Sequence, residues 1–196
     1  MLTIKHRINT LQSLRKVPQE YGVELDLHYS DGKVYVGHDP NDLGISFESY
    51  LSKYRHAFMA VNVKEEGIED MVLETLQEYK IEDFFLFDLT FPSIFRLKSL
   101  GESRIAVRIS DFENIRDFNL IRDKVQWLWI DVFQSAHFLE EFDWLQLIDF
   151  KKCFVSPELH LNRKSYVSNN IRKSMLQYID KFDAVCTKDE SLWKRI

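Results

Sequence analysis

The sequence predicts an α/β protein whose single domain, residues 1–196, is a small (β/α)₈ barrel. Eight short apolar runs alternate with stretches that have the spacing of amphipathic helices. The alternative, a doubly wound open sheet, predicts a Gly-rich phosphate loop after the first strand, and the sequence has none there. No Pro/Gly linker, low-complexity segment or charge block divides the chain, so we expect one core.

The expected strands are the eight apolar runs in chain order. Each run ends in polar residues, as barrel strands do where they lead into active-site loops. The runs are 2–5, 23–27, 57–63, 84–88, 105–109, 127–132, 153–155 and 184–186.

The expected helices lie between these runs. The segment from Gly67 to Tyr79 has the clearest helical period, with apolar residues at Ile68, Val72 and Leu76. The other stretches are less regular. We expect helices at 9–17, 46–55, 91–100, 112–124, 137–149 and 164–180.

Composition excludes several function classes. The net charge of −5 gives no basic footprint for nucleic acid, and no apolar run is long enough to span a membrane. The first residues lack the apolar region of a signal peptide, so a cytoplasmic location is expected. Cys153 and Cys186 lie in apolar runs without a Cys-x-x-Cys partner, which is typical of buried free thiols in a reducing compartment.

Two carboxylates lie on one face of the second expected strand. Glu24 and Asp26 are two residues apart, and strand side chains two apart point the same way. Such a pair is costly to bury unless a positive charge lies between the two groups. A divalent cation that prefers oxygen ligands, Mg²⁺ or Ca²⁺, is therefore the expected cofactor. The structural alternative is a half-buried hairpin with a solvated acidic side.

A hairpin is expected directly after these carboxylates. Asp31-Gly32 lies between apolar-rich segments and is a strong signal for a two-residue turn. The return strand brings His38 and Asp39 back toward the carboxylates. Strict alternation would place His38 on the other face, so we expect a bulge or a strand end near Gly37.

Polar residues also follow the other expected strands. Their mixture of carboxylates, basic groups and histidines fits chemistry on a phosphate ester, because basic groups hold phosphoryl oxygens and histidines exchange protons near neutral pH. These residues are His6 and Arg7, Asn62 and Lys64, Asp88, Arg108, Asp131 and Glu158.

Each basic residue also has a structural interpretation. Arg7, Lys64 and Arg108 are the candidate phosphate contacts. Arg108 would instead be structural if it only pairs with Asp88 or Asp131. Lys64 would be structural if it only neutralises Glu24.

The second half of the chain offers further candidates for substrate contact. Trp129 shares a strand face with Asp131 and is expected to wall the pocket. Glu158 follows the seventh strand. His28 and His160 are interpreted as surface or supporting residues.

The order of the early motifs resembles the glycerophosphodiester phosphodiesterase (GDPD) signature. These motifs are His6-Arg7, Glu24-x-Asp26 and His38-Asp39, and Asn62-x-Lys64 aligns with the family's Glu-x-Lys on the third strand. The later strand ends resemble a short subgroup associated with bacterial surface-polysaccharide genes. The resemblance implies a barrel of the phosphodiesterase type that hydrolyses a small glycerophosphodiester to glycerol 3-phosphate and an alcohol.

The resemblance also implies residue roles. His6 and His38 would be the acid/base pair. The implied cation ligands are Glu24, Asp26 and Asn62, with Asp88 compensating from the neighbouring strand. The implied substrate-binding residues are Arg7 and Lys64, joined by the candidates Arg108, Trp129, Asp131 and Glu158.

Two departures from the family pattern leave alternatives open. Asn62 replaces an acidic ligand and removes one negative charge, which weakens cation binding. Ile8 replaces a glycine and is expected to tighten the space beside the phosphate. One alternative is a phosphate-ligand binding protein without turnover. Another is a lyase or transferase in which a substrate hydroxyl attacks phosphorus to give a cyclic phosphate.

Overall fold

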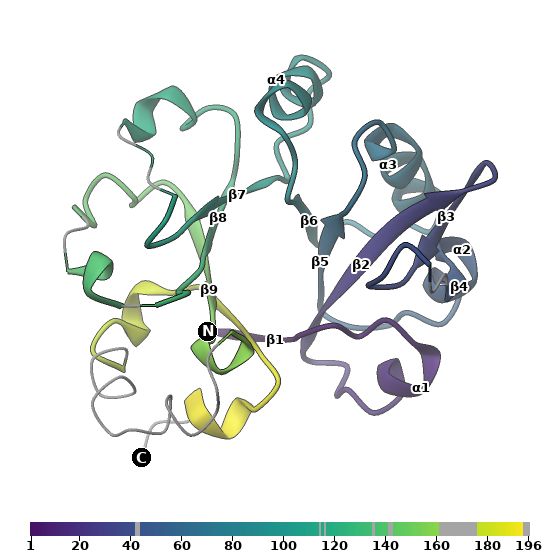
Figure 1. The fold of residues 1–196 in the computed structure, drawn as a ribbon, viewed down its shortest axis with the longest axis horizontal. Helices are drawn as coiled ribbons and strands as arrows, with labels where there is room; N and C mark the ends of the chain where they lie inside the picture. The colour runs from purple at the N-terminus through teal and green to yellow at the C-terminus, as the bar shows by residue number, and fades with distance from the viewer. Residues whose placement is uncertain are drawn as a thin grey trace.

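The computed structural model of the chain describes residues 1–41, 44–113, 115, 117–134, 136–140, 143–160 and 176–193. The expected mixed α/β class is confirmed, because one large sheet carries helices on its outer face (Figure 1). In Figure 1 the N-terminal half of the chain and the C-terminal strands lie on opposite sides of the first strand.

Every one of the eight apolar runs forms a strand. Two further short strands belong to the hairpin region. In the described part of the chain the sheet comprises β1 Leu2–Lys5, β2 Gly22–Ser30, β3 Lys33–Val36, β4 Ile45–Ser46, β5 Phe58–Val63, β6 Phe84–Phe87, β7 Ala106–Ile109, β8 Trp127–Ile130, β9 Lys151–Val155 and β10 Ala184–Thr187.

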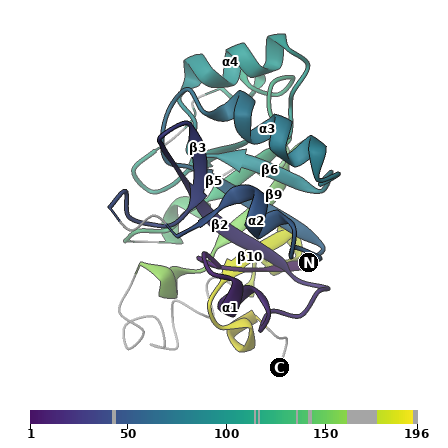
Figure 2. The ribbon, with the colours of Figure 1, turned by 90° about the vertical axis from the view of Figure 1, so that its right-hand side faces the viewer.

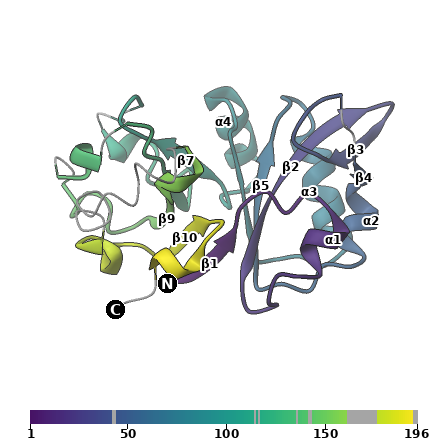
Figure 3. The ribbon, with the colours of Figure 1, turned by 60° about the horizontal axis from the view of Figure 1, so that its bottom comes forward.

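Eight of these strands, all except β3 and β4, run parallel to one another. Their order is β7-β8-β9-β10-β1-β2-β5-β6, and Figure 3 shows β1 in the middle, with β10 on one side and β2 on the other. A single parallel bridge joins Leu86 of β6 to Ile105, the residue before β7. Because these strands run in parallel, their carboxyl ends lie at one edge of the sheet.

The hairpin after β2 turns at Asp31 and Gly32, whose φ angles are 47° and 80°. β3 returns antiparallel to β2 and ends at Val36, and the Gly37 N–H donates to the carbonyl of Asp26 at 3.0 Å. Since the regular pairing ends there, the strict alternation of side chains does not extend to the residues that follow.

Four expected helices are present, and polar caps define where three of them begin. They are α1 Leu11–Leu14, α2 Phe47–Leu51, α3 Glu69–Glu78 and α4 Phe91–Ser99. The side chains of Thr10, Ser46 and Thr90 accept backbone N–H groups at the starts of α1, α2 and α4. Figure 2 shows these helices, which lie outside the strands.

The predictions of helices at 112–124 and 137–149 are wrong for the described residues of these segments. Single 3₁₀ turns occupy these stretches, η1 Phe118–Leu120 and η2 Ala136–Leu139. The carboxylates of Asp117 and Asp143 accept the N–H groups of Asn119 and Leu145, and such bonds compete with a helical backbone. Most of the helix expected at 164–180 lies outside the described residues. The remaining turns are η3 Pro157–Leu159, η4 Ile179–Lys181 and η5 Glu190–Trp193.

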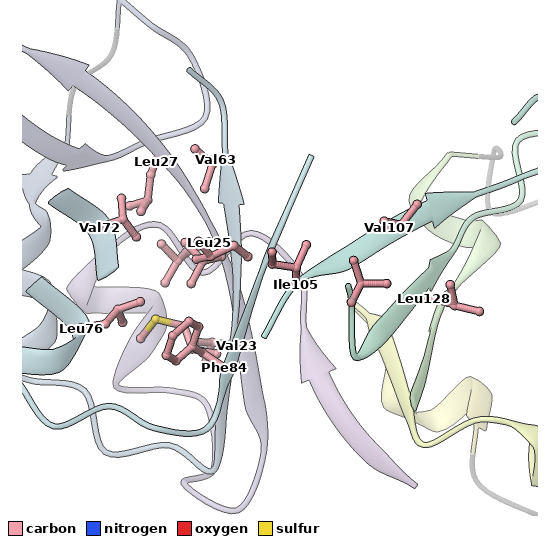
Figure 4. Close-up of a cluster of buried hydrophobic side chains, with 14 of the residues drawn as sticks. Val23, Leu25, Leu27, Val63, Val72, Leu76, Phe84, Ile105, Val107 and Leu128 are labelled. Atoms are coloured by element: carbon pink, nitrogen blue, oxygen red, sulfur yellow. The ribbon is translucent and has the colours of Figure 1, made fainter. Parts of the chain in front are cut away.

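The main apolar cluster lies between the strands and the helices. Every second residue of β2 points toward α3. Figure 4 shows Val23, Leu25 and Leu27 in one cluster with Val72 and Leu76 of the helix. All five are buried, and full burial of one such side chain contributes roughly 1.5–3 kcal/mol.

A second apolar cluster comes from the opposite face of the strands. Gly22 of β2 lies on this face, where an added Cβ would be 3.0 Å from Ile4 and 3.1 Å from the carbonyl oxygen of Phe58. This inner cluster consists of Ile4, Phe58, Ala60, Phe85, Phe87, Ala106, Trp127, Trp129, Cys153, Val155, Ala184 and Cys186.

Both cysteines are free and buried in the inner cluster, in agreement with the sequence. Burial raises the pKa of the Cys153 and Cys186 thiols well above the ordinary value. Among the described residues, none of the helices has the length and apolar character needed to cross a bilayer.

Candidate active site

The candidate site lies above the inner cluster, at the carboxyl ends of β1, β2 and β5. Asp26 pairs in register with Asn62, and Glu24 pairs with Ala60, a member of the inner cluster. Residues paired across parallel strands share a face, so Glu24, Asp26 and Asn62 lie together. The two carboxylates are each only 1% exposed.

Glu24 is held by the segment that follows β1. The Arg7 N–H donates to the Glu24 carboxylate at 2.7 Å, and the Ile8 N–H donates to the Glu24 carbonyl at 2.7 Å. Burial, followed by the nearby charge of Asp26, raises the pKa of Glu24 to about 8. Without a cation, this carboxyl group is therefore mostly protonated at neutral pH.

Asp26 has two partners. Lys64 approaches one carboxylate oxygen at 3.1 Å, and the side-chain amide of Asn9 donates to the other at 2.8 Å. The Asn9 side-chain oxygen in turn accepts the Asp26 N–H at 3.0 Å. The salt bridge of Lys64 is thus with Asp26, not with Glu24. Asn9 was missed in the sequence, although it follows the His6-Arg7 motif closely.

Asn62 supplies an unused oxygen at this site. Its side-chain carbonyl is buried and accepts no hydrogen bond within the described residues, which is costly unless another group binds there. The oxygens of Glu24, Asp26 and Asn62 form the donor set that a hard divalent cation prefers, so the residues fit such an ion. Across the described ranges, no cluster of three or more His, Cys, Asp or Glu side chains forms a metal site.

His6 lies beside Glu24, with 3.7 Å between its Nε2 and the carboxylate. Its Nδ1 is buried and has no hydrogen-bond partner in the described part of the chain. Burial lowers the pKa of His6 to about 3, and the charges of Arg7 and Lys188 act in the same direction. The ring is therefore neutral at physiological pH. A pKa this low makes it a weak base, which an ionised Glu24 beside it would strengthen.

Positive groups surround His6. Arg7 is exposed beside it with a left-handed φ of 54°. The register of β1 with β10 places Lys188 next to His6, and the His6 N–H donates to the carbonyl of Thr187 at 3.2 Å. Lys188 and His160 were not among the predicted site residues, because their proximity depends on strand order rather than on spacing along the chain.

His38 lies just after β3, with 37% of its side chain exposed. Its Nδ1 is 3.1 Å from the carboxylate of Asp39, its neighbour in the chain. The ring of His28 bridges the carbonyl of His38 and the carboxylate of Glu65, both at 3.0 Å. His28 is thus a buried supporting residue for this segment.

Asp88 and Arg108 lie farther along the sheet edge. They approach each other at 3.5 Å, while Arg108 makes a two-pronged contact with Glu113 at 2.8 and 3.0 Å. Asp88 follows the last residue of β6 with a left-handed φ of 62°, so the alternation of the strand does not extend to it. The structure therefore places Asp88 with Arg108, apart from the pair of Glu24 and Asp26.

The remaining candidates are embedded in contacts of the protein itself. Trp129 is buried and stacks on Phe87, with ring centroids 4.3 Å apart, so it packs beneath the site. The Glu158 carboxylate accepts the hydroxyl of Thr187 at 2.5 Å and the Lys188 N–H at 3.2 Å. Asp131 is buried and binds His160.

Ile8 does not crowd the site. Its side chain belongs to the main apolar cluster, between the strands and the helices. The Ile8 carbonyl accepts a hydrogen bond from the Tyr50 hydroxyl at 2.8 Å. The expected tightening beside the phosphate is wrong, because the chain turns the side chain of Ile8 to the opposite face.

The two shifted pKa values predict how stability depends on pH in EDTA-treated protein. Between pH 6.5 and 8 the Glu24 carboxyl is ionised in the unfolded chain but retains its proton in the folded state, so stability falls as the pH rises. His6 makes the folded state more stable as the pH rises, but only at lower pH, between about 3 and 6.5. Urea midpoints should therefore decline from pH 6.5 to 8 in the native protein, and less in Glu24→Gln. Equal slopes for the two proteins would contradict the assignment.

No protein-family model and no curated protein matches this sequence. Among solved structures, a glycerophosphodiester phosphodiesterase from Agrobacterium tumefaciens str. C58 is similar, with a TM-score of 0.65. The match covers 98% of this chain and 97% of that chain at 14% sequence identity. A likeness at this identity establishes the fold, and the chain therefore has a GDPD-like fold.

Proposed function

We propose that this chain is a metal-dependent phosphodiester hydrolase acting on a glycerophosphodiester or a related sugar or polyol phosphodiester. One observation carries the proposal. The buried pair of Glu24 and Asp26 lies beside the neutral ring of His6 and an Asn62 oxygen that has no partner among the described residues. The GDPD-like fold supports the same reading, although fold alone does not decide function.

The same proposal includes a closed barrel. The eight parallel strands follow one another through β6, and the bridge between Leu86 and Ile105 lies where closure would occur. The inner cluster is apolar and buried, as the packed interior of a closed barrel is. The subgroup linked to surface-polysaccharide genes and the cytoplasmic location remain predictions.

Glu24, Asp26 and Asn62 would hold one divalent cation, Mg²⁺ or Ca²⁺. The bound cation would polarise the phosphorus centre and neutralise charge that develops on the phosphoryl oxygens. Asp26 would exchange part of its contact with Lys64 for the cation. Asp88 is left out of this set because it contacts Arg108.

The basic groups near His6 would bind the phosphate. Arg7 is exposed at the site and Lys64 lies against Asp26, so both can reach a phosphoryl oxygen bound between them. Arg108 lies farther along the edge and would contact a larger substrate. His6 would accept the proton of the attacking water, and His38 is its proposed acid/base partner.

The experiment is ³¹P NMR of purified protein with glycerophosphodiesters and a CDP-polyol, in EDTA, Mg²⁺ or Ca²⁺. We expect a phosphomonoester to form only with a cation. A cyclic phosphate as the product would indicate the transferase reaction instead. Phosphate binding without cleavage of any substrate would indicate a binding protein.

Asn62→Asp is expected to tighten cation binding. The change restores one negative charge at the site, and about 1.4 kcal/mol of added attraction corresponds to tenfold tighter binding. Calorimetric titration with Ca²⁺ measures the effect. The matched control is Asn119→Asp, which adds the same charge on the exposed turn η1. Equal affinities for the two variants would remove Asn62 from the ligand set.

A further inference from the structure

His160 and Asp131 contact each other at the carboxyl-terminal edge of the sheet, where the candidate site also lies. The His160 Nε2 is 2.6 Å from the carboxylate of Asp131, which is buried at the end of β8. The His160 ring also packs against Phe133, with centroids 4.6 Å apart. A histidine whose ring is fixed by a buried carboxylate has the arrangement found in catalytic dyads.

The pair lies on the part of the edge that leads to His6. The strand order β8-β9-β10-β1 places Asp131, His160, Lys188 and His6 at the ends of successive strands. β1 pairs directly with β10, and β10 pairs with β9, so His160 follows the strand two places along the sheet edge from His6.

One ring nitrogen of His160 is available for a reaction. Nε2 is used by Asp131, whereas Nδ1 makes no hydrogen bond within the residues that the structure describes. The side chain is 30% exposed, so the ring is anchored at one nitrogen and open to a ligand at the other.

We infer that His160, in place of the proposed partner His38, protonates the alcohol oxygen that leaves phosphorus, with Asp131 as its positioning residue. The inference rests on the proposed hydrolysis. As the bond between phosphorus and the alcohol oxygen breaks, its electron pair goes to that oxygen, and the proton on His160 Nδ1 follows. The oxygen of the attacking water forms the new bond to phosphorus, and its proton goes to His6. Neutral alcohol and neutral imidazole at His160 result.

The assignment gives His6 a partner that is already in place. His38 bonds its exposed neighbour Asp39 and lies after β3, which pairs with the same edge of β2 as β1 does. His160 is held by a buried carboxylate on the side where Lys188 adjoins His6. An alcohol that leaves toward β9 and β10 would meet His160.

The test compares kcat on a glycerophosphodiester with an alkyl leaving group for the native protein, His160→Gly and His160→Gln. We expect kcat to fall about 100-fold or more with little change in KM. Added imidazole should restore part of the rate to His160→Gly. Asp131→Asn should lower kcat less and gain nothing from imidazole, because His160 remains. His56→Gln is the control, since His56 precedes β5 at the far end of the strand.

The outcomes separate the two claims. No cleavage by the native protein would overturn the proposed hydrolysis and this inference with it. Cleavage by the native protein with unchanged kcat in both His160 variants would overturn only the role of His160. Failure of imidazole to restore folded His160→Gly would also overturn it, as would loss of kcat confined to His38→Ala.

Discussion

His6→Ala is expected to lower phosphodiester turnover by about 10³-fold while the protein stays folded. The ring lies beside Glu24, and its buried Nδ1 has no partner among the described residues. Removing it therefore breaks no hydrogen bond of the ring that the structure shows. The loss should appear in kcat, because the variant removes a proton acceptor and keeps Arg7 and Lys64 for phosphate binding.

Initial rates from ³¹P NMR and a thermal melt of the same preparation measure both parts of this expectation. His56→Ala is the control, because it removes a histidine at the opposite end of β5. Turnover of His6→Ala close to that of the native protein would remove His6 from the proton transfer. A large drop in melting temperature would show that the ring is structural.

Glu24→Ala is expected to abolish measurable cation binding and turnover. The carboxylate is almost fully buried beside Asp26, and its raised pKa shows that the fold alone does not favour its charged form. Since a bound cation would favour the charged form, a buried glutamate at this position is better explained by cation binding than by a contribution to folding. In EDTA we expect the variant to be no less stable at pH 8 than the native protein.

Calorimetry with Ca²⁺ and urea unfolding in EDTA separate these roles. Glu24→Gln is the closer variant, because its amide oxygen can still accept the Arg7 N–H. Asp123→Ala removes an exposed carboxylate and serves as the control. Unaltered Ca²⁺ affinity in Glu24→Gln would contradict the ligand role, and unfolding of both Glu24 variants would show that the carboxylate supports the structure.

The strands were predictable because buried parallel strands are nearly continuous apolar runs. Val23–Leu27 and Phe58–Val63 are examples, and the polar residues that follow them mark the sheet edge. The irregular connections were not predictable in this way. Around Asp117 and Asp143, local side-chain bonds to the backbone outweigh a weak helical spacing.

The site was predictable where its residues share one strand. Glu24 and Asp26 follow from the two-residue period alone. Asn9 reaches Asp26 from another segment, and the pairing of His160 with Asp131 joins the ends of two strands. Such contacts depend on which strands are neighbours in the sheet, and spacing along the chain carries no signal for them.

Anomalous diffraction can locate a cation bound at this site. Crystals would be grown with Mn²⁺, a stand-in for Mg²⁺, and inorganic phosphate. We predict an anomalous peak bound by Glu24, Asp26 and the side-chain oxygen of Asn62. The absence of a peak there, with Lys64 still paired to Asp26 and phosphate bound without metal, would contradict the account.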